Sequence, residues 1–308
     1  MTRRIIIDTD PGTDDAIALL LAFASPGLDI RLISVAGGNV GLRHTLVNAR
    51  GLVALAGVTI PVVAGADRPL VGQFAAAPDV HGDDGMMGVS LPPGPPATPG
   101  IAADAIRAEL RAAPANSVTL IGLGPATNLA LALTTEPALA DRVAEIVLMT
   151  GAWAEGNITP SAEFNAFCDP EALQILFDCG RPVTLATLEL TAQALCTPAH
   201  VATLRATPGG AALHVATEIL SRMKPSRRLG GRGAPQHDSC AVAWVAAPHL
   251  FTTRPVHAAV NLSPGPDRGR TIIDRWGRNG LAPNVTLLDT LDADGFFALL
   301  TARLPTLP

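Results

Sequence analysis

Residues 5–15 read Ile-Ile-Ile-Asp-Thr-Asp-Pro-Gly-Thr-Asp-Asp and lead directly into an apolar stretch at residues 16–24. The run of Ile predicts a buried strand, Pro11 and Gly12 predict a turn, and the apolar stretch predicts a helix. A strand that leads through a turn into a helix is typical of the α/β folds. The aspartates of the turn then lie at the carboxyl end of the first strand, where open α/β sheets bind their ligands.

Four carboxylates crowd this turn, those of Asp8, Asp10, Asp14 and Asp15. Two like charges about 4 Å apart repel by roughly 4 kcal/mol at an effective dielectric near 20, and a helix N-terminus offers only about half a compensating charge. No Lys or Arg lies between Arg4 and Arg31, so a divalent cation with oxygen ligands is the simplest neutralising partner. The alternative is that Asp14 or Asp15 only caps the following helix, but a cap needs one acid rather than four.

The rest of the chain predicts an open, mostly parallel sheet flanked by helices, in a single domain of residues 1–308. Further strands are expected at residues 31–36, 61–64, 117–123, 145–150 and 182–186, and near Thr271 and Val285. Helices are expected at residues 44–56, 101–112, 126–134 and 293–304. We interpret residues 72–100, which end in a Pro- and Gly-rich stretch, as a surface excursion that is either a lid or wall of a pocket or a disordered loop.

Composition excludes several functions. The formal net charge is -5, and no basic surface interleaved with aromatic residues is visible, so we expect no nucleic-acid partner. The one basic stretch, residues 222–232, reads first as a mobile loop and second as a phosphate site. We expect no membrane partner, because the apolar runs are shorter than the roughly 20 residues that span a bilayer. The absence of a signal-peptide pattern and of disulfide spacing among the four Cys predicts a cytoplasmic protein.

Polar residues follow most of the expected strands, and parallel strands bring such ends to one edge of a sheet. The second strand is followed by Gly37-Gly38-Asn39, and the fourth by Gly122-Leu123-Gly124-Pro125. The loop at residues 155–165 adds four amide or acid side chains, which suit a sugar with several hydroxyls beside a cation. The backbone carbonyl of Leu123 is a further candidate ligand of that cation.

His237 and Asp238 stand just ahead of a helical run at residues 239–247. Asp238 is either an N-cap or another metal ligand, depending on whether its loop folds over the aspartate turn. His237 is either a structural residue or a proton donor near neutral pH.

The segment Asp8-Thr9-Asp10-Pro11-Gly12-Thr13-Asp14-Asp15-Ala16 resembles the signature of the inosine-uridine-preferring nucleoside hydrolases. The resemblance continues in the family's order through the blocks Gly37-Gly38-Asn39, Gly124-Pro125-Ala126-Thr127-Asn128, Val147-Leu148-Met149, Glu155-Gly156-Asn157, Ala162-Glu163-Phe164-Asn165, Asp169-Pro170-Glu171-Ala172 and His237-Asp238. It implies a nucleoside hydrolase-like fold, related to the Rossmann fold. It also implies hydrolysis of a small-molecule ribonucleoside to ribose and free base on one Ca²⁺, in purine or pyrimidine salvage, by a homodimer or homotetramer.

Carried over position by position, the resemblance assigns roles to individual residues. Ca²⁺ would be held by Asp10, Asp15, Asp238 and the carbonyl of Leu123. The ribose hydroxyls would be bound by Asp14, Asn39, Asn157, Glu163 and Asn165, with Met149 at the pocket floor. Asp10 would also take the proton of the metal-bound water, and His237 matches the position of the leaving-group acid in one branch of the family.

The base preference is left open by departures from the family's pattern. Met149 is followed by Thr150-Gly151-Ala152 rather than by a Gly-rich run, and the chain has no Tyr, whereas pyrimidine-preferring relatives use tyrosines before the His-Asp pair. His81 matches a histidine of the family's first flexible loop and would close over the base. Trp153 would either stack on the base or lie in the core.

Other functions compete with this interpretation. An aspartyl phosphatase also has an Asp-x-Asp turn after its first strand, but the later Lys and acidic pair that it needs are not visible. An EF-hand loop that starts at Asp8 would need Glu at its twelfth position, where the chain has Leu19. A calcium-dependent riboside-binding protein without catalysis, or a hydrolase of an unusual riboside, stays an alternative.

Overall fold

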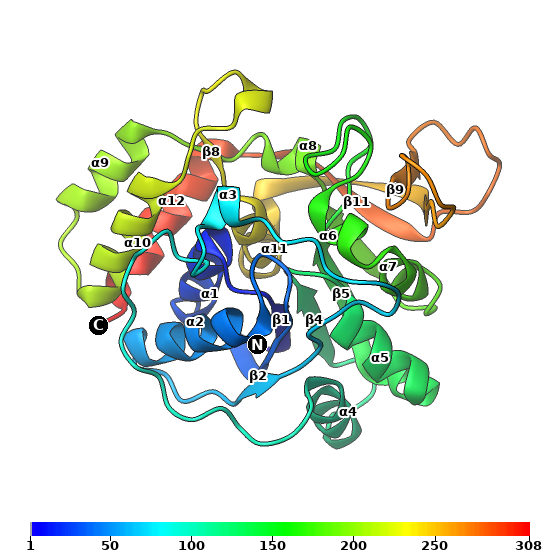
Figure 1. Cartoon of the computed structure of the whole chain (residues 1–308), viewed down its shortest axis with the longest axis horizontal. Coiled ribbons are helices and arrows are strands. Elements are labelled where there is room, and N and C mark those ends of the chain that lie inside the picture. Colours follow the sequence, from blue (N-terminus) through cyan, green and yellow to red (C-terminus); the bar gives the residue numbers. More distant parts are fainter. Residues whose placement is uncertain (1) are drawn as a thin grey trace.

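The structure, a computed structural model, describes residues 2–308, and nine strands form its central sheet (Figure 1). In chain order these strands are β1 (Arg3–Thr9), β2 (Leu28–Val35), β3 (Val62–Ala64), β4 (Val118–Gly122), β5 (Val143–Met149), β6 (Val183–Ala186), β9 (Phe251–Val260), β10 (Thr271–Asp274) and β11 (Val285–Leu291). Their order across the sheet is β10-β9-β11-β6-β5-β4-β1-β2-β3. β9 is antiparallel to both of its neighbours and all other pairs are parallel. The predicted open, mostly parallel α/β sheet is confirmed.

Helices cover both faces of this sheet (Figure 1). They are α1 (Thr13–Phe23), α2 (Leu42–Leu55), α3 (Pro78–His81), α4 (Ala102–Ala112), α5 (Thr127–Thr135), α6 (Phe164–Cys168), α7 (Pro170–Phe177), α8 (Leu188–Thr191), α9 (Pro198–Ala206), α10 (Ala211–Arg222), α11 (His237–Ala246) and α12 (Ala293–Arg303). Short 3₁₀ helices lie at Pro137–Arg142, Arg227–Leu229, Pro248–Leu250 and Leu304–Thr306, and a small ribbon pairs β7 (Leu195–Cys196) with β8 (Ala234–Pro235). None of the helices described in residues 2–308 is long and apolar enough to cross a membrane.

The Ile run of β1 divides its side chains between two hydrophobic cores. Ile5 and Ile7 pack into the core under α1, α2, α10, α11 and α12, and Ile6 packs into the core under α4, α5 and α7. All three side chains are fully buried. Successive residues of a strand point to opposite faces, so an unbroken apolar run is what a central strand covered on both faces requires.

Two features of the C-terminal half differ from the sequence-based expectation. β9 is a ten-residue strand that was not predicted, because Pro255 and several polar residues interrupt its apolar pattern. His237 and Asp238 are the first two residues of α11 rather than residues ahead of it, so they take their direction from the helix. Gln236 is the residue that precedes the helix as its N-cap.

The excursion at residues 72–100 is tied to the body of the protein at several points. The guanidinium of Arg50 in α2 donates to the carbonyls of Gly94 and Pro95, and the backbone of Thr98 donates to Val62 in β3. Its single helix, α3, ends at His81, which is buried against the first turn of α1. The excursion therefore lies first against the carboxyl edge of the sheet, at His81, and then runs past α2 to the amino end of β3.

Candidate active site

A cavity of about 630 Å³ opens at the carboxyl ends of β1 and β4. The chain leaves β1 toward β2 and β3 on one side and later returns to β4 and β5 on the other, so this is the point where the strand order reverses and where open α/β sheets bind ligands. Residues 77, 79–81 and 223–227 line the cavity from two loops that lie far apart in the sequence. The predicted site residues in its lining are Asp14, Asn39, His81, Leu123, Met149, Asn157, Glu163, Asn165, His237 and Asp238.

Three carboxylates meet beside this cavity. Oxygens of Asp14, Asp15 and Asp238 all lie within 4.8 Å of one another. Asp15 is held by three donors: Thr9 Oγ1 at 2.5 Å, the backbone of Gly12 at 3.0 Å and Asn39 Nδ2 at 3.0 Å. The first turn of α1 and the start of α11 thus bring together acids more than 200 positions apart in the sequence.

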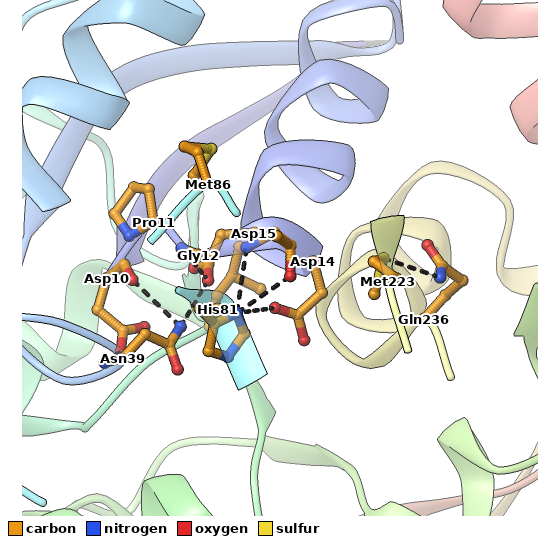
Figure 2. Close-up of polar contacts among 12 residues, drawn as sticks. Asp10, Pro11, Gly12, Asp14, Asp15, Asn39, His81, Met86, Met223 and Gln236 are labelled. Atoms are coloured by element: carbon orange, nitrogen blue, oxygen red, sulfur yellow. Dashed lines mark hydrogen bonds and ion pairs between the residues drawn. The ribbon is translucent and has the colours of Figure 1, made fainter. Parts of the chain in front are cut away.

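Asp10 is fully buried and lies next to this group. Asn39 donates hydrogen bonds both to Asp10 and to Asp15 of the group (Figure 2). Asp10 Oδ2 accepts the backbone N–H of Asn39 at 2.7 Å, and the backbone carbonyl of Asp10 accepts Asn39 Nδ2 at 3.2 Å. Asp10 Oδ1 and Asp14 Oδ1 are buried and have no hydrogen-bond partner within residues 2–308. A buried carboxylate oxygen without a donor is costly, so these two atoms are suited to contact a cation.

The acids raise one another's pKa values. Burial raises the pKa of Asp14 to about 6, and burial together with the charge of Asp14 raises the pKa of Asp15 to about 6. Burial and the charges of Asp14, Asp15 and Asp10 raise the pKa of Asp238 well above its usual range, and Asp10 is raised in the same way by burial and Asp15. Without a cation the cluster cannot hold its full negative charge at low cost.

Asp8 belongs to a separate polar network, which corrects the expectation of four acids around one turn. Its Oδ1 accepts hydrogen bonds from Ser34 Oγ and from Asn128 Nδ2, and Asn128 Oδ1 in turn accepts the backbone N–H of Ala66. Burial raises the pKa of Asp8 to about 7, against the effect of these hydrogen bonds. Successive side chains of a strand point to opposite faces of the sheet. The side chain of Asp8 links β1 to Ser34 in β2 and to Asn128 in α5.

Two glycines leave room for the Asp10 carboxylate. A Cβ on Gly38 would lie 2.1 Å from Asp10 Oδ2, and a Cβ on Gly124 would lie 2.3 Å from Asp10 Oδ1. Both distances are far below van der Waals contact, so any side chain at either position displaces the carboxylate. The glycines that follow β2 and β4 therefore make room for the Asp10 carboxylate, which the backbone N–H of Asn39 holds.

The loop after β5 presents amide groups whose orientation is set by the backbone. Asn165 Nδ2 donates to the carbonyls of Leu123 at 2.7 Å and Met149 at 3.0 Å, which leaves its Oδ1 for the cavity. Asn157 Oδ1 accepts the backbone N–H of Phe164 at 2.8 Å, which leaves its Nδ2. Glu163 caps α6 and accepts four hydrogen bonds, from the backbones of Asn165, Gly151 and Ala166 and from Thr150 Oγ1.

Two histidines line the cavity, and burial favours the neutral form of both. His81 Nδ1 accepts the backbone N–H of Thr13 at 3.2 Å and lies 3.8 Å from Asp14 Oδ1; burial lowers the pKa of His81 to about 4. His237 Nδ1 lies 2.7 Å from Thr191 Oγ1. Burial, with the charge of Arg228, lowers the pKa of His237 to about 3. Each ring therefore acts through a single N–H.

Trp153 is the one predicted substrate contact that the structure keeps away from both the cavity lining and the acids. Its ring stacks under the guanidinium of Arg275, 4.2 Å from the ring centroid, and its backbone N–H donates to Glu189. Trp153 is 36% exposed, so it does not lie in the core. Asp10 and Asp15 are also absent from the lining, but they lie directly behind it.

Sequence reasoning missed several residues of the site. Thr13 anchors His81, Thr191 contacts His237, and residues 223–227 line the cavity mouth. Thr191 lies five positions after the carboxyl end of β6. A search for polar residues after each parallel strand, which found the other loops, could therefore have found Thr191 as well. The mouth residues belong to the basic stretch at residues 222–232, for which the sequence predicts a loop or a phosphate site.

The fold and this acid-lined cavity at the switch point define an α/β enzyme of the nucleoside hydrolase type. Solved structures with the same fold include the plant nucleoside hydrolase PpNRh1, with a TM-score of 0.90, 29% identity and 99% of both chains covered. Another is the purine-preferring ribonucleoside hydrolase from Gardnerella vaginalis, with a TM-score of 0.90, 29% identity and 99% and 98% coverage.

Residues 5–298 match the family described as inosine-uridine preferring nucleoside hydrolase. Proteins named pyrimidine-specific ribonucleoside hydrolase RihA, from Salmonella gallinarum and Shewanella woodyi, are 40% and 39% identical to the chain, each over 99% of both sequences. The chain belongs to the inosine-uridine preferring nucleoside hydrolase family, as its motifs predicted, and it is a ribonucleoside hydrolase.

Proposed function

We propose that this enzyme hydrolyses the N-glycosidic bond of pyrimidine ribonucleosides to ribose and free base, with one calcium ion bound. The observation that carries the proposal is the pair of buried, unpartnered oxygens, Asp10 Oδ1 and Asp14 Oδ1, in a cluster of acids beside a nucleoside-sized cavity. The names of relatives at 40% identity support pyrimidine nucleosides. The fold itself accepts other bases, because a neighbour at 29% identity is named as purine-preferring.

The donor set beside the cavity fits a hard cation. Asp10, Asp15, Asp238 and the carbonyl of Leu123 would hold the ion, and all four offer oxygen, the ligand that calcium prefers. Asp14 lies close enough to Asp15 and Asp238 to belong to the same charged group. When bound, calcium would lower the pKa of a water molecule and bind neighbouring ribose hydroxyls.

Asp10 is the proposed proton acceptor for the attacking water. Its Oδ2 is occupied by the backbone of Asn39, whereas its Oδ1 has no donor within the described chain. In the metal-free protein, burial and the charge of Asp15 raise the pKa of Asp10. A base positioned in this way contributes about 10²–10⁴-fold to a rate.

The amides and Glu163 are the proposed ribose site. Asn165 Oδ1 is a fixed acceptor and Asn157 Nδ2 is a fixed donor, because the other atom of each amide is held by backbone groups. Asp14 and Asn39 would bind further hydroxyls, above Met149 as the floor. The carboxylate of Glu163 stabilises the positive charge that develops on ribose as the glycosidic bond breaks.

His237 and His81 are the proposed contacts of the departing base. In the tautomer in which Thr191 Oγ1 donates to Nδ1, the Nε2–H of the neutral His237 ring would donate a hydrogen bond to the base, on which negative charge develops. His81 is fixed by Thr13 and would lie over the base without moving from the first turn of α1.

We also propose that the enzyme acts in the cytoplasm, in nucleoside salvage, as a homodimer or homotetramer and without a nucleic-acid partner. All four cysteines are free and three of them are buried, as is typical of proteins from a reducing compartment.

The test is ribose release from uridine, cytidine, inosine and adenosine, with calcium and then with a chelator. We expect calcium-dependent release from the two pyrimidine nucleosides and much slower release from the purine nucleosides. Binding of nucleosides without release would favour the non-catalytic riboside-binding protein, and release only from other ribosides would favour the unusual hydrolase.

A further inference from the structure

The cavity carries acids in its buried lining and cations where it is exposed. Asp14 and Asp238 are buried, whereas the segment at residues 223–227 brings the exposed Lys224 and Arg227 to the mouth. Asp79 also lines the cavity, and its backbone carbonyl accepts a hydrogen bond from Lys224 Nζ at 3.0 Å. The mouth is therefore cationic, although the chain as a whole is acidic.

The segment at the mouth is held in place by the start of α11. Gln236 Nε2 contacts the sulfur of Met223 at 3.7 Å (Figure 2), and the backbone N–H of Ser226 donates to the carbonyl of Gly233 at 3.0 Å. The two cations of this segment differ in their hydrogen bonds. Lys224 donates to the excursion, whereas the guanidinium of Arg227 has no hydrogen bond or ion pair with any residue of the described chain, 2–308.

The proposed ribose site places the base beside this mouth. If the sugar hydroxyls meet the acids and amides, the base would occupy the rest of the cavity, whose lining includes His237, His81 and Arg227. A guanidinium offers five N–H donors and no acceptor. It therefore pairs with a carbonyl oxygen and repels an amino group, and the chain has no Tyr that could serve as both donor and acceptor.

We infer that Arg227 selects bases with a carbonyl oxygen on the edge far from ribose, so that uridine is hydrolysed in preference to cytidine. This inference rests on the proposed function. The uracil ring leaves with negative charge spread onto its carbonyl oxygens, and the guanidinium stabilises that charge more in the transition state than in the bound substrate. The selectivity therefore lies mainly in kcat rather than in KM.

The experiment compares kcat/KM for uridine and cytidine in the calcium-loaded wild-type enzyme, Arg227→Ala, Arg227→Lys and a control, Arg232→Ala. Arg232 belongs to the same loop, is exposed, and donates only to the carbonyl of Leu229, outside the cavity lining. We expect the wild type to favour uridine by about 10-fold or more, since sites built to hydrogen-bond one substrate group discriminate well against its loss. Arg227→Ala should bring the ratio to about 2 or below by lowering the rate on uridine, Arg227→Lys should keep part of it, and Arg232→Ala should keep all of it.

Equal rates on uridine and cytidine in the wild type, or an unchanged ratio in Arg227→Ala, would overturn the inference. Failure to release ribose from any nucleoside would instead contradict the proposed function. A second measurement needs no variant: because Arg227 is exposed, about 0.5 M NaCl should lower the uridine preference of the wild type, and a salt-independent preference would also count against Arg227.

Discussion

The hydroxyl of Thr191 lies 2.7 Å from Nδ1 of His237, and this contact joins α8, the short helix after β6, to the first turn of α11. When the hydroxyl donates to Nδ1, the ring proton sits on Nε2, which is the nitrogen left to meet a base. Thr191 is fully buried, so it acts on the reaction through His237 and not through the substrate.

Thr191→Val should therefore lower kcat on uridine by about 10-fold while KM stays within about 2-fold, because the ring loses the partner that sets its tautomer. Thr191→Ser keeps a hydroxyl and should retain most of the activity. The readout is steady-state kinetics on uridine, with melting temperatures as the check on folding. A parallel rise in KM, or no recovery in Thr191→Ser, would mean that Thr191 only packs.

His237→Ala should reduce hydrolysis of uridine by about 10²–10³-fold, the usual contribution of a hydrogen-bond donor aimed at developing negative charge. The loss should be far smaller on p-nitrophenyl riboside, whose leaving group departs without a proton. Thr191→Val added to His237→Ala should cause little further loss, since both act through one ring. Equal losses on the two substrates would leave His237 with a structural role alone.

Asp10→Asn should abolish turnover while ribose still binds, because the amide keeps the size of the carboxylate but cannot accept the water's proton. Loss of a general base costs about 10²–10⁴-fold in rate. Isothermal titration with ribose, beside the kinetic assay, separates binding from chemistry. Near wild-type activity would exclude Asp10 as the base.

Calcium should stabilise the protein in a pH-dependent way. Burial raises the pKa of Asp14 and Asp15 from 3.8 to about 6, so between these values the folded chain holds protons that the unfolded chain has released. The free energy of unfolding of the metal-free protein then falls as the pH rises from about 4 to about 6. Calcium competes with those protons, so it should raise the melting temperature more at about pH 7.5 than at about pH 4.5. Equal shifts at both pH values would contradict a calcium site on these acids.

The fold could be predicted from the sequence because each local signal agreed with the global one. The Ile run of β1, the turn at Pro11-Gly12 and the apolar helix after it each specify one element, and the resulting parallel sheet brings strand ends together by topology. The exception, β9, is informative: Pro255 weakens the local pattern, and pairing with β10 and β11 on either side decides the outcome.

Only those site residues that lie at strand ends or in motifs could be predicted from the sequence. Asp14, Asn39 and Asp238 were found in this way, and the cavity lining includes all three. The separation of Asp8 from the cluster, the stacking of Trp153 under Arg275 and the contact of Thr191 with His237 depend on side-chain packing between distant segments. Spacing along the chain carries no information on such contacts.

Gly38→Ala should inactivate the enzyme although it changes no predicted ligand. The added Cβ would lie 2.1 Å from Asp10 Oδ2, so the carboxylate must move, and forcing extra volume into a packed site costs about 1–3 kcal/mol. We expect kcat to fall by about 10²-fold, as for other small displacements of catalytic groups, together with weaker calcium binding. Gly41→Ala is the matched control in the same loop, because nothing lies within 4 Å of its Cβ position and its φ of -61° suits any residue. If both variants keep wild-type kinetics, the fixed position of Asp10 does not limit the reaction.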